Sequence, residues 1–247
     1  RKIQIPKLWR LYVDIIITYL RMSVKHFVII LAGGKGKRMQ TDILKQFLVL
    51  GKKPVIFHSL NTFFEFDKKC ILTVVLPESQ ILQWKKICKQ YEFKLSHNII
   101  LGGKTRYESV KNALFNLKFN KDDMISIHDG VRPFISKKLI KKLYKSALLK
   151  GHAVPILNSN DSIRMYIEKN ITSKSVDRTK FIFTQTPQIF KANIIKNAYK
   201  KDKDKATDDI TLIEDYVQRV NLIKGEKINM KITTKEDWDL AQKIIRS

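Results

Sequence analysis

The stretch 27-FVIILAGGKGKRM-39 joins an apolar run to a loop rich in glycine and basic side chains. A short apolar run with β-branched residues, ended by glycine, is typical of a buried strand. Glycines beside Lys and Arg directly after a strand are typical of a loop that binds phosphate through backbone N–H groups. The stretch therefore predicts an α/β protein with an anion-binding loop after its first strand.

The loop does not match two common nucleotide-binding fingerprints. A Walker loop needs Ser or Thr after Gly-Lys, whereas Gly36-Lys37 is followed by Arg38. Its first glycine is also missing, because Leu31 occupies that position. A dinucleotide fingerprint needs a third glycine where Met39 stands. The loop alone indicates a phosphate without indicating which one.

Strand-like and helix-like patterns alternate after this loop. The expected strands are 27–31, 71–76, 98–101, 124–129 and 153–157, and the expected helices are 54–64, 78–91, 107–117 and 136–149. Such alternation predicts a doubly wound, mostly parallel, Rossmann-like sheet with its ligand site at the carboxyl ends of the strands. The glycine loop, 102-GGKTR-106 and 128-HDGVRP-133 each follow an expected strand, so we expect them to lie together.

Residues 158–185 interrupt this alternation. Polar and apolar side chains alternate along the segment, with a turn-like centre at residues 168–170. The pattern predicts a protruding two-stranded β-ribbon. A lone hairpin is marginally stable in water, so we expect the ribbon to pack on another surface, with a second subunit as the candidate.

The composition indicates one globular domain with an unusual charge. The chain has 247 residues, 44% hydrophobic residues and a net charge of +25. Such a charge suits either a nucleic-acid-binding protein or lysines dispersed over an enzyme that uses anionic substrates. Because lysines occur in nearly every segment rather than in one arm, we favour the second interpretation. Cys70 and Cys88 form no metal-binding pattern, and we expect buried, reduced thiols in the cytoplasm.

Residues 1–21 precede Met22 and differ from the rest of the chain. Their apolar part, residues 11–20, contains Asp14 and is shorter than the roughly 20 residues that a membrane-spanning helix needs. We expect residues 22–247 to form one domain and residues 1–21 to be an extension, either non-native or disordered. A helix lying on a membrane surface is the alternative, and we expect no membrane partner.

Further motifs complete a family pattern in chain order. They are 45-KQF-47, 102-GGKTRYESV-110, 128-HDGVRPF-134, 161-DSIR-164, 176-VDR-178, 184-TQTPQ-188, 207-TDD-209 and 229-NMKITT-234. With the glycine loop, they resemble the 2-C-methyl-D-erythritol 4-phosphate cytidylyltransferase family over residues 25–246. The resemblance implies a nucleotidyltransferase fold and transfer of CMP from CTP to a methylerythritol phosphate, with release of pyrophosphate.

The chemistry of that reaction fits what the sequence offers. A phosphate monoester has a second pKa of about 6, so its oxygen is already anionic near neutral pH and no general base is needed. The reaction needs positive charge and in-line alignment instead. We therefore expect basic residues and backbone donors at the site, and we interpret His128 as structural rather than catalytic.

The resemblance also implies roles for individual residues. Those expected to stabilise the reacting phosphates are Arg38, Lys45, Arg178 and Lys231. Those expected to bind CTP are Ala32, Gly33, Gly34, Gly36, Gly102, Gly103, Arg106 and Ser109. Those expected to contact the alcohol substrate are Asp129, Arg132, Ser162, Thr186 and Thr207. Thr-Asp-Asp at 207–209 also suits a helix N-cap.

Two partners of the site are implied in the same way. Mg²⁺ is expected to arrive with CTP, with the phosphates supplying most of its ligands and Asp129 the one protein candidate. The chain is expected to form a homodimer in which the ribbon carries Ser162 and Arg178 into the partner's site. Asp177 is expected either to orient Arg178 or to be a surface charge.

Two other functions remain open at this point. Ribitol-5-phosphate cytidylyltransferases are similar in the glycine loop, the HDxVRPF-like segment and the C-terminal motif. The motifs 176-VDR-178 and 207-TDD-209 favour methylerythritol phosphate over ribitol phosphate. A basic nucleic-acid-binding protein is the alternative from another class, and we expect no nucleic-acid partner.

Overall fold

The computed structural model describes residues 24–34, 44–169, 171–200, 206 and 208–246. The expectations for residues 1–21, Gly36, Arg38 and Thr207 lie outside these ranges. The main sheet has eight strands in the order β10-β7-β11-β6-β1-β4-β5, with β12 beside β7. They are β1 His26–Leu31, β4 Ile71–Leu76, β5 Asn98–Leu101, β6 Met124–Asp129, β7 His152–Asn158, β10 Ile182–Thr184, β11 Gln188–Lys191 and β12 Leu222–Lys224.

Most of the sheet is parallel, as the sequence predicts. Strands β5, β4, β1 and β6 run in one direction, so that Val28 of β1 pairs with Leu72 on one side and Ser126 on the other. Strand β11 lies antiparallel between β6 and β7, and β10 is antiparallel to β7. The mostly parallel α/β fold is confirmed, and the antiparallel strands at one side are an addition that the alternation of patterns did not predict.

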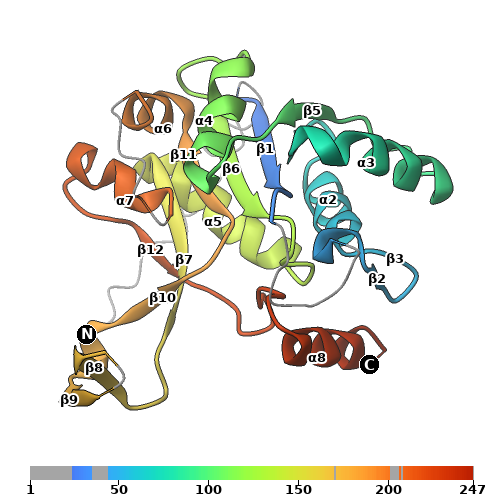
Figure 1. Cartoon of the computed structure of the whole chain (residues 1–247). Coiled ribbons are helices and arrows are strands. Elements are labelled where there is room, and N and C mark those ends of the chain that lie inside the picture. Colours follow the sequence, from blue (N-terminus) through green and yellow to red (C-terminus); the bar gives the residue numbers. More distant parts are fainter. Residues whose placement is uncertain (1–23, 35–43, 170, 201–205, 207, 247) are drawn as a thin grey trace, which may run out of the picture.

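Helices cover both faces of the sheet (Figure 1). They are α2 Val55–Phe66, α3 Glu78–Gln90, α4 Arg106–Asn116, α5 Lys137–Lys150, α6 Ala192–Ala198, α7 Ile210–Ile213 and α8 Lys235–Arg246. Short elements complete the description: η2 Lys45–Phe47, β2 Val49–Leu50, β3 Lys53–Pro54, η3 Arg178–Lys180 and η4 Glu214–Tyr216. No helix within the described ranges has the length and apolar character needed to cross a membrane.

Strand β1 contributes to a core on each face of the sheet. Val28 and Ile30 pack in a cluster with residues of α2, α3 and α5. Phe27 and Ile29 point to the other face and pack with residues of α4, α6 and α7. A strand buried on both sides needs apolar side chains at successive positions, which explains the continuous apolar run.

Trp84 of α3 is fully buried in the first of these clusters, as its helical spacing predicts. Its ring stacks on Phe47 at 5.9 Å between centroids and meets Phe57 edge-on at 5.6 Å. Its indole Nε1 donates a hydrogen bond of 3.0 Å to Nε2 of His97. Trp84 therefore joins α3 to η2, which carries the KQF motif.

The two cysteines are free and half-buried rather than fully buried. Burial raises the pKa of Cys70 to about 12 and that of Cys88 to about 11. Both thiols are therefore protonated at neutral pH. Both side chains pack against the first core cluster, so the expectation of buried thiols is met only in part.

The predicted ribbon exists but is shorter than expected. Strands β8 (Ile163–Glu168) and β9 (Thr172–Val176) pair antiparallel and project from the domain at the lower left of Figure 1. The chain then passes through η3 and returns as β10, which pairs with β7. Residues 182–184 thus belong to the main sheet, because an alternating pattern suits a sheet edge as well as a free ribbon.

Replacing Trp84 with Ala should lower the free energy of unfolding by about 3–5 kcal/mol, because the change opens a cavity among aromatic rings. Denaturant unfolding followed by circular dichroism measures this difference. Leu82→Ala is the matched control on the same helix, because Leu82 is 74% exposed, and it should change the value by less than about 0.5 kcal/mol. Equal losses in both variants would contradict this packing.

Candidate functional site

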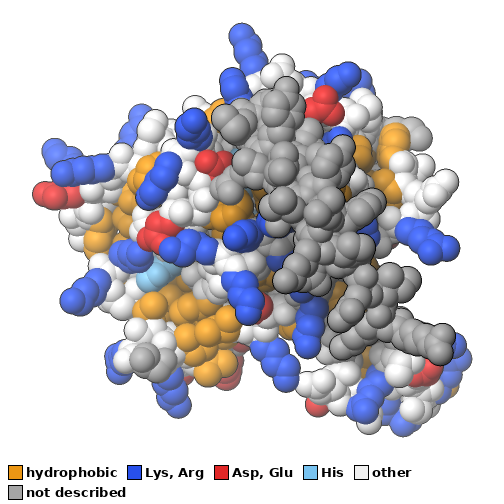
Figure 2. Space-filling model, turned by 180° about the vertical axis from the view of Figure 1, so that it is seen from behind, with side chains coloured by type: hydrophobic (Ala, Val, Ile, Leu, Met, Phe, Trp, Pro, Cys, Tyr) orange, Lys and Arg blue, Asp and Glu red, His pale blue; other side chains and the backbone are white. Residues whose placement is uncertain are grey.

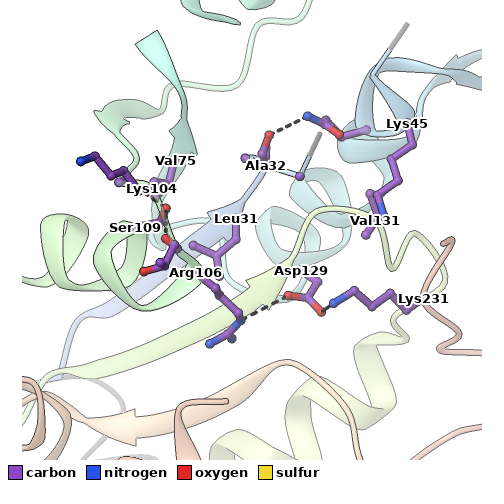
Figure 3. A pocket seen from close by; sticks show the side chains of 15 residues that line it. Leu31, Ala32, Lys45, Val75, Lys104, Arg106, Ser109, Asp129, Val131 and Lys231 are labelled. Carbon is purple, nitrogen blue, oxygen red and sulfur yellow. Dashed lines mark hydrogen bonds and ion pairs between the residues drawn. The ribbon is translucent and has the colours of Figure 1, made fainter. Parts of the chain in front are cut away.

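A pocket of about 260 Å³ opens at the carboxyl ends of β1 and β6. The start of the glycine loop, the loop after β5 and the motif 229-NMKITT-234 all contribute to it (Figure 3). It is lined by Leu31, Ala32, Gly33, Gly34, Lys45, Gln46, Val75, Gly103, Lys104, Thr105, Arg106, Ser109, Asp129, Val131 and Lys231. The strand ends thus bring together the separate motifs, as a parallel sheet predicts.

Asp129, the last residue of β6, is surrounded by three basic side chains. Its Oδ2 lies 2.9 Å from Nζ of Lys231 and 3.5 Å from Nε of Arg132. Its Oδ1 lies 3.8 Å from Nε of Arg106. Burial alone would raise the pKa of Asp129, but Lys231, Arg106 and Arg132 together hold it well below its usual range. The carboxylate is therefore charged at neutral pH and organises the cations around it.

Thr186 and His128 lie behind Asp129. The backbone N–H of Asp129 donates to Oγ1 of Thr186 at 3.0 Å, and the Thr186 hydroxyl lies 3.1 Å from Nδ1 of His128. Nε2 of His128 lies 3.2 Å from the carbonyl oxygen of Arg132, which fixes it as the protonated nitrogen. Burial lowers the pKa of His128 to about 4, so the ring is neutral and structural.

Arg132 is nearly buried beside this group. Its Nη1 donates to the carbonyl oxygen of Asn229 at 2.9 Å, two residues before Lys231. Neither Arg132 nor Thr186 lines the pocket. Their observed contacts hold Asp129 and the segment of Lys231 in place, whereas the sequence analysis expected direct contacts with the alcohol substrate.

The loop after β5 begins helix α4 and forms another wall of the pocket. Thr105 is the N-cap, and its Oγ1 accepts a hydrogen bond from the backbone N–H of Glu108 at 3.0 Å. Ser109 Oγ accepts from the N–H of Gly103 at 3.1 Å and donates to the carbonyl oxygen of Thr105 at 2.8 Å. A Cβ on Gly103 would collide with Glu108. Glycine at position 103 therefore permits the close turn. Gly102, the residue before it, lies just outside the pocket lining.

The opposite wall is formed by the start of the glycine loop and by η2. Lys45 and Gln46 are both buried and line the pocket. Nε2 of Gln46 donates to the carbonyl oxygen of Ala32 at 2.6 Å, which ties η2 to the end of β1. Among the described residues, a Cβ on Gly33 or Gly34 would meet only ordinary contacts with Pro77 and Lys45. Both glycines line the pocket.

Arg106 is held by a carboxylate that the sequence analysis did not select. Its guanidinium donates to both oxygens of Asp209, at 2.9 and 2.5 Å. Asp209 is fully buried and also accepts a bond of 2.6 Å from the hydroxyl of Tyr199. Burial alone would lower the pKa of Arg106, but Asp209 and Asp129 raise it well above its usual value. Arg106 therefore carries a fixed positive charge.

Residues on and beside the ribbon lie apart from the pocket lining. Arg178 is exposed in η3 and donates to the carbonyl oxygen of Asn160 at 2.5 Å, and Ser162 is exposed just before β8. Asp177 accepts two bonds from Thr179 and caps η3. These local bonds favour a capping role for Asp177 over the alternative in which it orients Arg178.

The structure thus collects most, but not all, of the expected site residues. Those that line the pocket are Ala32, Gly33, Gly34, Lys45, Gly103, Arg106, Ser109, Asp129 and Lys231. The polar lining residues that the sequence did not predict are Gln46, Lys104 and Thr105, and Asp209 behind Arg106 was not predicted either. The first three stand inside motifs that were quoted, so position within a motif was the available signal.

The donor set favours a polyanionic ligand over a metal held by protein ligands. Among the described residues, no group of three or more His, Cys, Asp or Glu side chains is arranged to hold a metal ion. The oxygens of Asp129 face cations instead. Three basic side chains around two carboxylates leave a net positive site, to which Lys45 adds a further charge. Such a pocket can bind phosphates and stabilise charge that moves between them.

Comparisons with known proteins agree with this chemistry. The family model described as 2-C-methyl-D-erythritol 4-phosphate cytidylyltransferase matches residues 26–247. Proteins of that name from Azobacteroides pseudotrichonymphae and Phocaeicola vulgatus are 41% and 39% identical to the chain. The first match covers 89% of this chain and 98% of that protein, and the second covers 88% and 98%.

A solved structure extends the agreement to the fold. The crystal structure of 4-diphosphocytidyl-2C-methyl-D-erythritol synthase from Anaerococcus prevotii superposes with a TM-score of 0.77 at 25% identity. The match covers 93% of this chain and 99% of that one. A family model over nearly the whole chain, relatives at about 40% identity and a common fold lead to one conclusion. The chain belongs to the 2-C-methyl-D-erythritol 4-phosphate cytidylyltransferase family.

Proposed function

We propose that this chain is the cytidylyltransferase that joins CTP to 2-C-methyl-D-erythritol 4-phosphate, a step of isoprenoid precursor synthesis. The observation that carries the proposal is the pocket itself. The start of the glycine loop and Lys45 form one wall of a cavity at the carboxyl ends of parallel strands, and Arg106 and Lys231 line the same cavity. The motifs of the family therefore meet where a nucleoside triphosphate needs backbone donors and positive charge.

The reaction follows from the charges of its partners. An oxygen of the phosphate monoester forms a bond to the α-phosphorus of CTP, while the bond from that phosphorus to its bridging oxygen breaks. Pyrophosphate leaves with the bridging oxygen, and no proton is removed from the attacking group near neutral pH. The neutral, buried ring of His128 is consistent with a reaction that needs no general base.

The basic residues of the pocket stabilise the charge that moves. Lys45 lies beside the glycine loop, where it neutralises the triphosphate, and Arg38 is proposed to act with it. Lys231 lies 2.9 Å from Asp129, which holds its ammonium group at the edge of the pocket. Arg106, Ser109 and the loop of Gly102 and Gly103 bind the nucleotide. These groups are in place before the reaction, so little reorganisation is needed as charge develops.

Mg²⁺ is proposed to enter as the complex with CTP. Triphosphate oxygens are hard ligands of the kind that Mg²⁺ prefers, and the ion usually keeps several waters. Because both oxygens of Asp129 face basic side chains, the phosphates rather than a protein cage supply its ligands. The ion offsets negative charge on the triphosphate.

A homodimer with shared sites is the proposed assembly. The ribbon and its base expose large apolar side chains, namely Met165, Tyr166, Ile167, Ile171, Phe181, Ile182 and Phe183. Patches of this kind usually mark an interaction surface. Arg178 and Ser162 lie on this segment and are proposed to reach the partner's pocket, where Arg178 and Thr207 contact the alcohol phosphate.

The positive charge of the chain suits anionic substrates better than a nucleic acid. Figure 2 shows Lys and Arg side chains scattered over one face, with Asp and Glu side chains between them. A nucleic-acid footprint is typically a continuous basic stripe. The cytoplasm is the proposed compartment, in keeping with two free thiols.

Pyrophosphate release with CTP should be rapid with 2-C-methyl-D-erythritol 4-phosphate and close to background with ribitol 5-phosphate. The two alcohols present different carbon skeletons to the same phosphate site, so the comparison isolates recognition of the alcohol. A coupled phosphate assay after pyrophosphatase measures both rates. Turnover with ribitol 5-phosphate alone would refute the proposed substrate.

Lys45→Met should lower kcat by about two to three orders of magnitude, since a preorganised charge at the reacting phosphates is lost. The fold should remain intact by circular dichroism, and Km for the alcohol should change less than kcat. Lys52→Met is the matched control, because Lys52 is an exposed turn residue outside the pocket lining. Lys45→Met with the kcat of the control would exclude this role.

Mixing Lys45→Ala and Arg178→Ala subunits should restore activity that neither variant has alone. A hybrid dimer contains one site with both residues intact, so random exchange gives roughly a quarter of the wild-type rate. Native mass spectrometry of differently tagged subunits establishes that hybrids form. Hybrids without recovered activity would contradict the completion of one site by the partner's ribbon.

A further inference from the structure

The buried carboxylate of Asp209 lies behind the pocket and has no assigned role in the reaction. We propose that Asp209 is a positioning residue that fixes the guanidinium of Arg106 in the orientation that binds CTP. The proposal rests on the function above to the extent that Arg106 belongs to the nucleotide site. It concerns how that side chain is held rather than whether the alcohol is turned over.

Arg106 and Asp209 are joined by a fork of two hydrogen bonds. Nη1 of Arg106 donates to Oδ1 of Asp209 at 2.9 Å, and Nη2 donates to Oδ2 at 2.5 Å. Two parallel bonds between planar groups fix the plane of the guanidinium as well as its place. A guanidinium has five N–H donors, so three remain beyond this fork. Arg106 lines the pocket and its side chain is 27% exposed, so donors remain available to a ligand there.

Asp209 is itself fixed by neighbours outside the pocket. The hydroxyl of Tyr199 donates to its Oδ1 at 2.6 Å. The ring of Tyr199 stacks on Tyr107 with centroids 4.9 Å apart, and Tyr107 directly follows Arg106. The N–H of Ile210 donates to Gln188 of β11 at 2.9 Å. The orientation of the carboxylate therefore does not depend on what occupies the pocket.

Arg106 also has a competing partner. Its Nε lies 3.8 Å from Asp129, the carboxylate that also contacts Lys231 and Arg132. Without Asp209, the most direct rearrangement would turn the guanidinium toward Asp129 and away from a ligand. The Asp209 fork thus keeps Arg106 on the nucleotide side of the pocket.

A purely structural role for Asp209 would have a different signature. If the Asp209–Arg106 pair were purely structural, removing the charge of Asp209 would leave a buried guanidinium without its partner. That change would lower the free energy of unfolding wherever in the protein the pair lay. Positioning instead predicts a loss of CTP affinity that depends on the presence of Arg106. The dissociation constant of CTP, measured without the alcohol substrate, separates the two roles.

Asp209→Asn should weaken CTP binding between about tenfold and about a hundredfold, since an amide replaces one acceptor oxygen of the charged fork by a donor. Isothermal titration calorimetry with CTP and Mg²⁺ measures this change. Asp208→Asn is the matched control on the adjacent residue. The Oδ2 of Asp208 accepts from Thr184 and Gln188 rather than from Arg106, so CTP affinity should stay within twofold of wild type, about the scatter of ordinary surface changes.

A double-mutant cycle tests whether Asp209 acts through Arg106. Arg106→Gln should lower CTP affinity, and adding Asp209→Asn should then change it by less than about twofold, because the shared interaction is already lost. Full additivity of the two losses would overturn the proposal. Unchanged CTP affinity in a folded Asp209→Asn protein would overturn it as well.

Tyr199→Phe keeps the proposal testable if Asp209→Asn does not fold. The change removes the 2.6 Å bond to Asp209 but retains the ring against Tyr107. It should weaken CTP binding about two- to fivefold through a loosened carboxylate. Tyr216→Phe is its control, since that hydroxyl donates to the carbonyl oxygen of Asn197 instead. Equal CTP affinity in the two phenylalanine variants would overturn the positioning role.

The outcomes for this proposal and for the proposed function are distinguishable. A wild-type protein that binds CTP but does not turn over 2-C-methyl-D-erythritol 4-phosphate would contradict the proposed function. The comparison of CTP affinity between wild type and Asp209→Asn would still decide the positioning role. A wild-type protein that does not bind CTP would refute both. Wild-type turnover together with CTP affinity that is insensitive to Asp209 would refute the positioning role alone.

Discussion

Strand β1 pairs in parallel with β4 on one side and with β6 on the other, and both of its faces are buried. This arrangement fixes where the carboxyl ends of three strands lie relative to one another. Ala32 directly follows β1, and Asp129 is the last residue of β6. Gly102 directly follows β5, which is the strand next to β4. Each functional loop is therefore placed by strand register rather than by its own contacts, and the loops need only short local bonds to reach the pocket.

Charge compensation supplies the second level of organisation. A carboxylate at the end of β6 and another before α7 hold the basic groups that a triphosphate requires. Fixed ion pairs of this kind are costly to form in a buried place unless further bonds complete them. Thr186 supports the backbone of Asp129, and Tyr199 supports the carboxylate of Asp209. The site thus carries its positive charges on a rigid frame rather than on mobile surface lysines.

The sequence predicted the parallel part of the sheet well because a strand buried on both faces leaves a continuous apolar run, as in residues 27–31. The order of strands and loops predicted that these loops meet at one edge of the sheet, whereas the individual pocket residues came from the family resemblance. The sequence did not distinguish β10 from the strands of the ribbon, because polar and apolar side chains alternate along both. It assigned no element after residue 185. Helices α6 and α7 are too short to show a helical period, whereas α8 is an amphipathic helix whose pattern was available in the sequence.

Long-range pairing was the part of the site that local patterns could not reveal. Asp209 and Arg106 are 103 residues apart, and nothing in 207-TDD-209 distinguishes a buried carboxylate from a helix cap. Asp208, the neighbour, does bond locally to Thr211. The two adjacent aspartates therefore have different partners: Asp208 bonds to Thr211, Thr184 and Gln188, whereas Asp209 bonds to Arg106. Only the packing of α7 against α4 and β11 determines which of them faces inward.

The ribbon leaves the domain after β7 and returns as β10, and these two strands are themselves paired. Its base is thus part of the main sheet, and residues 159–162 and η3 join this base to the two strands of the ribbon. A strand advances about 3.3 Å per residue. For a given rotation at the base, the displacement of the ribbon tip therefore grows in proportion to the length of the ribbon. Changes in ribbon length or in the β7–β10 pairing would alter where the tip points while leaving the pocket of the same chain untouched.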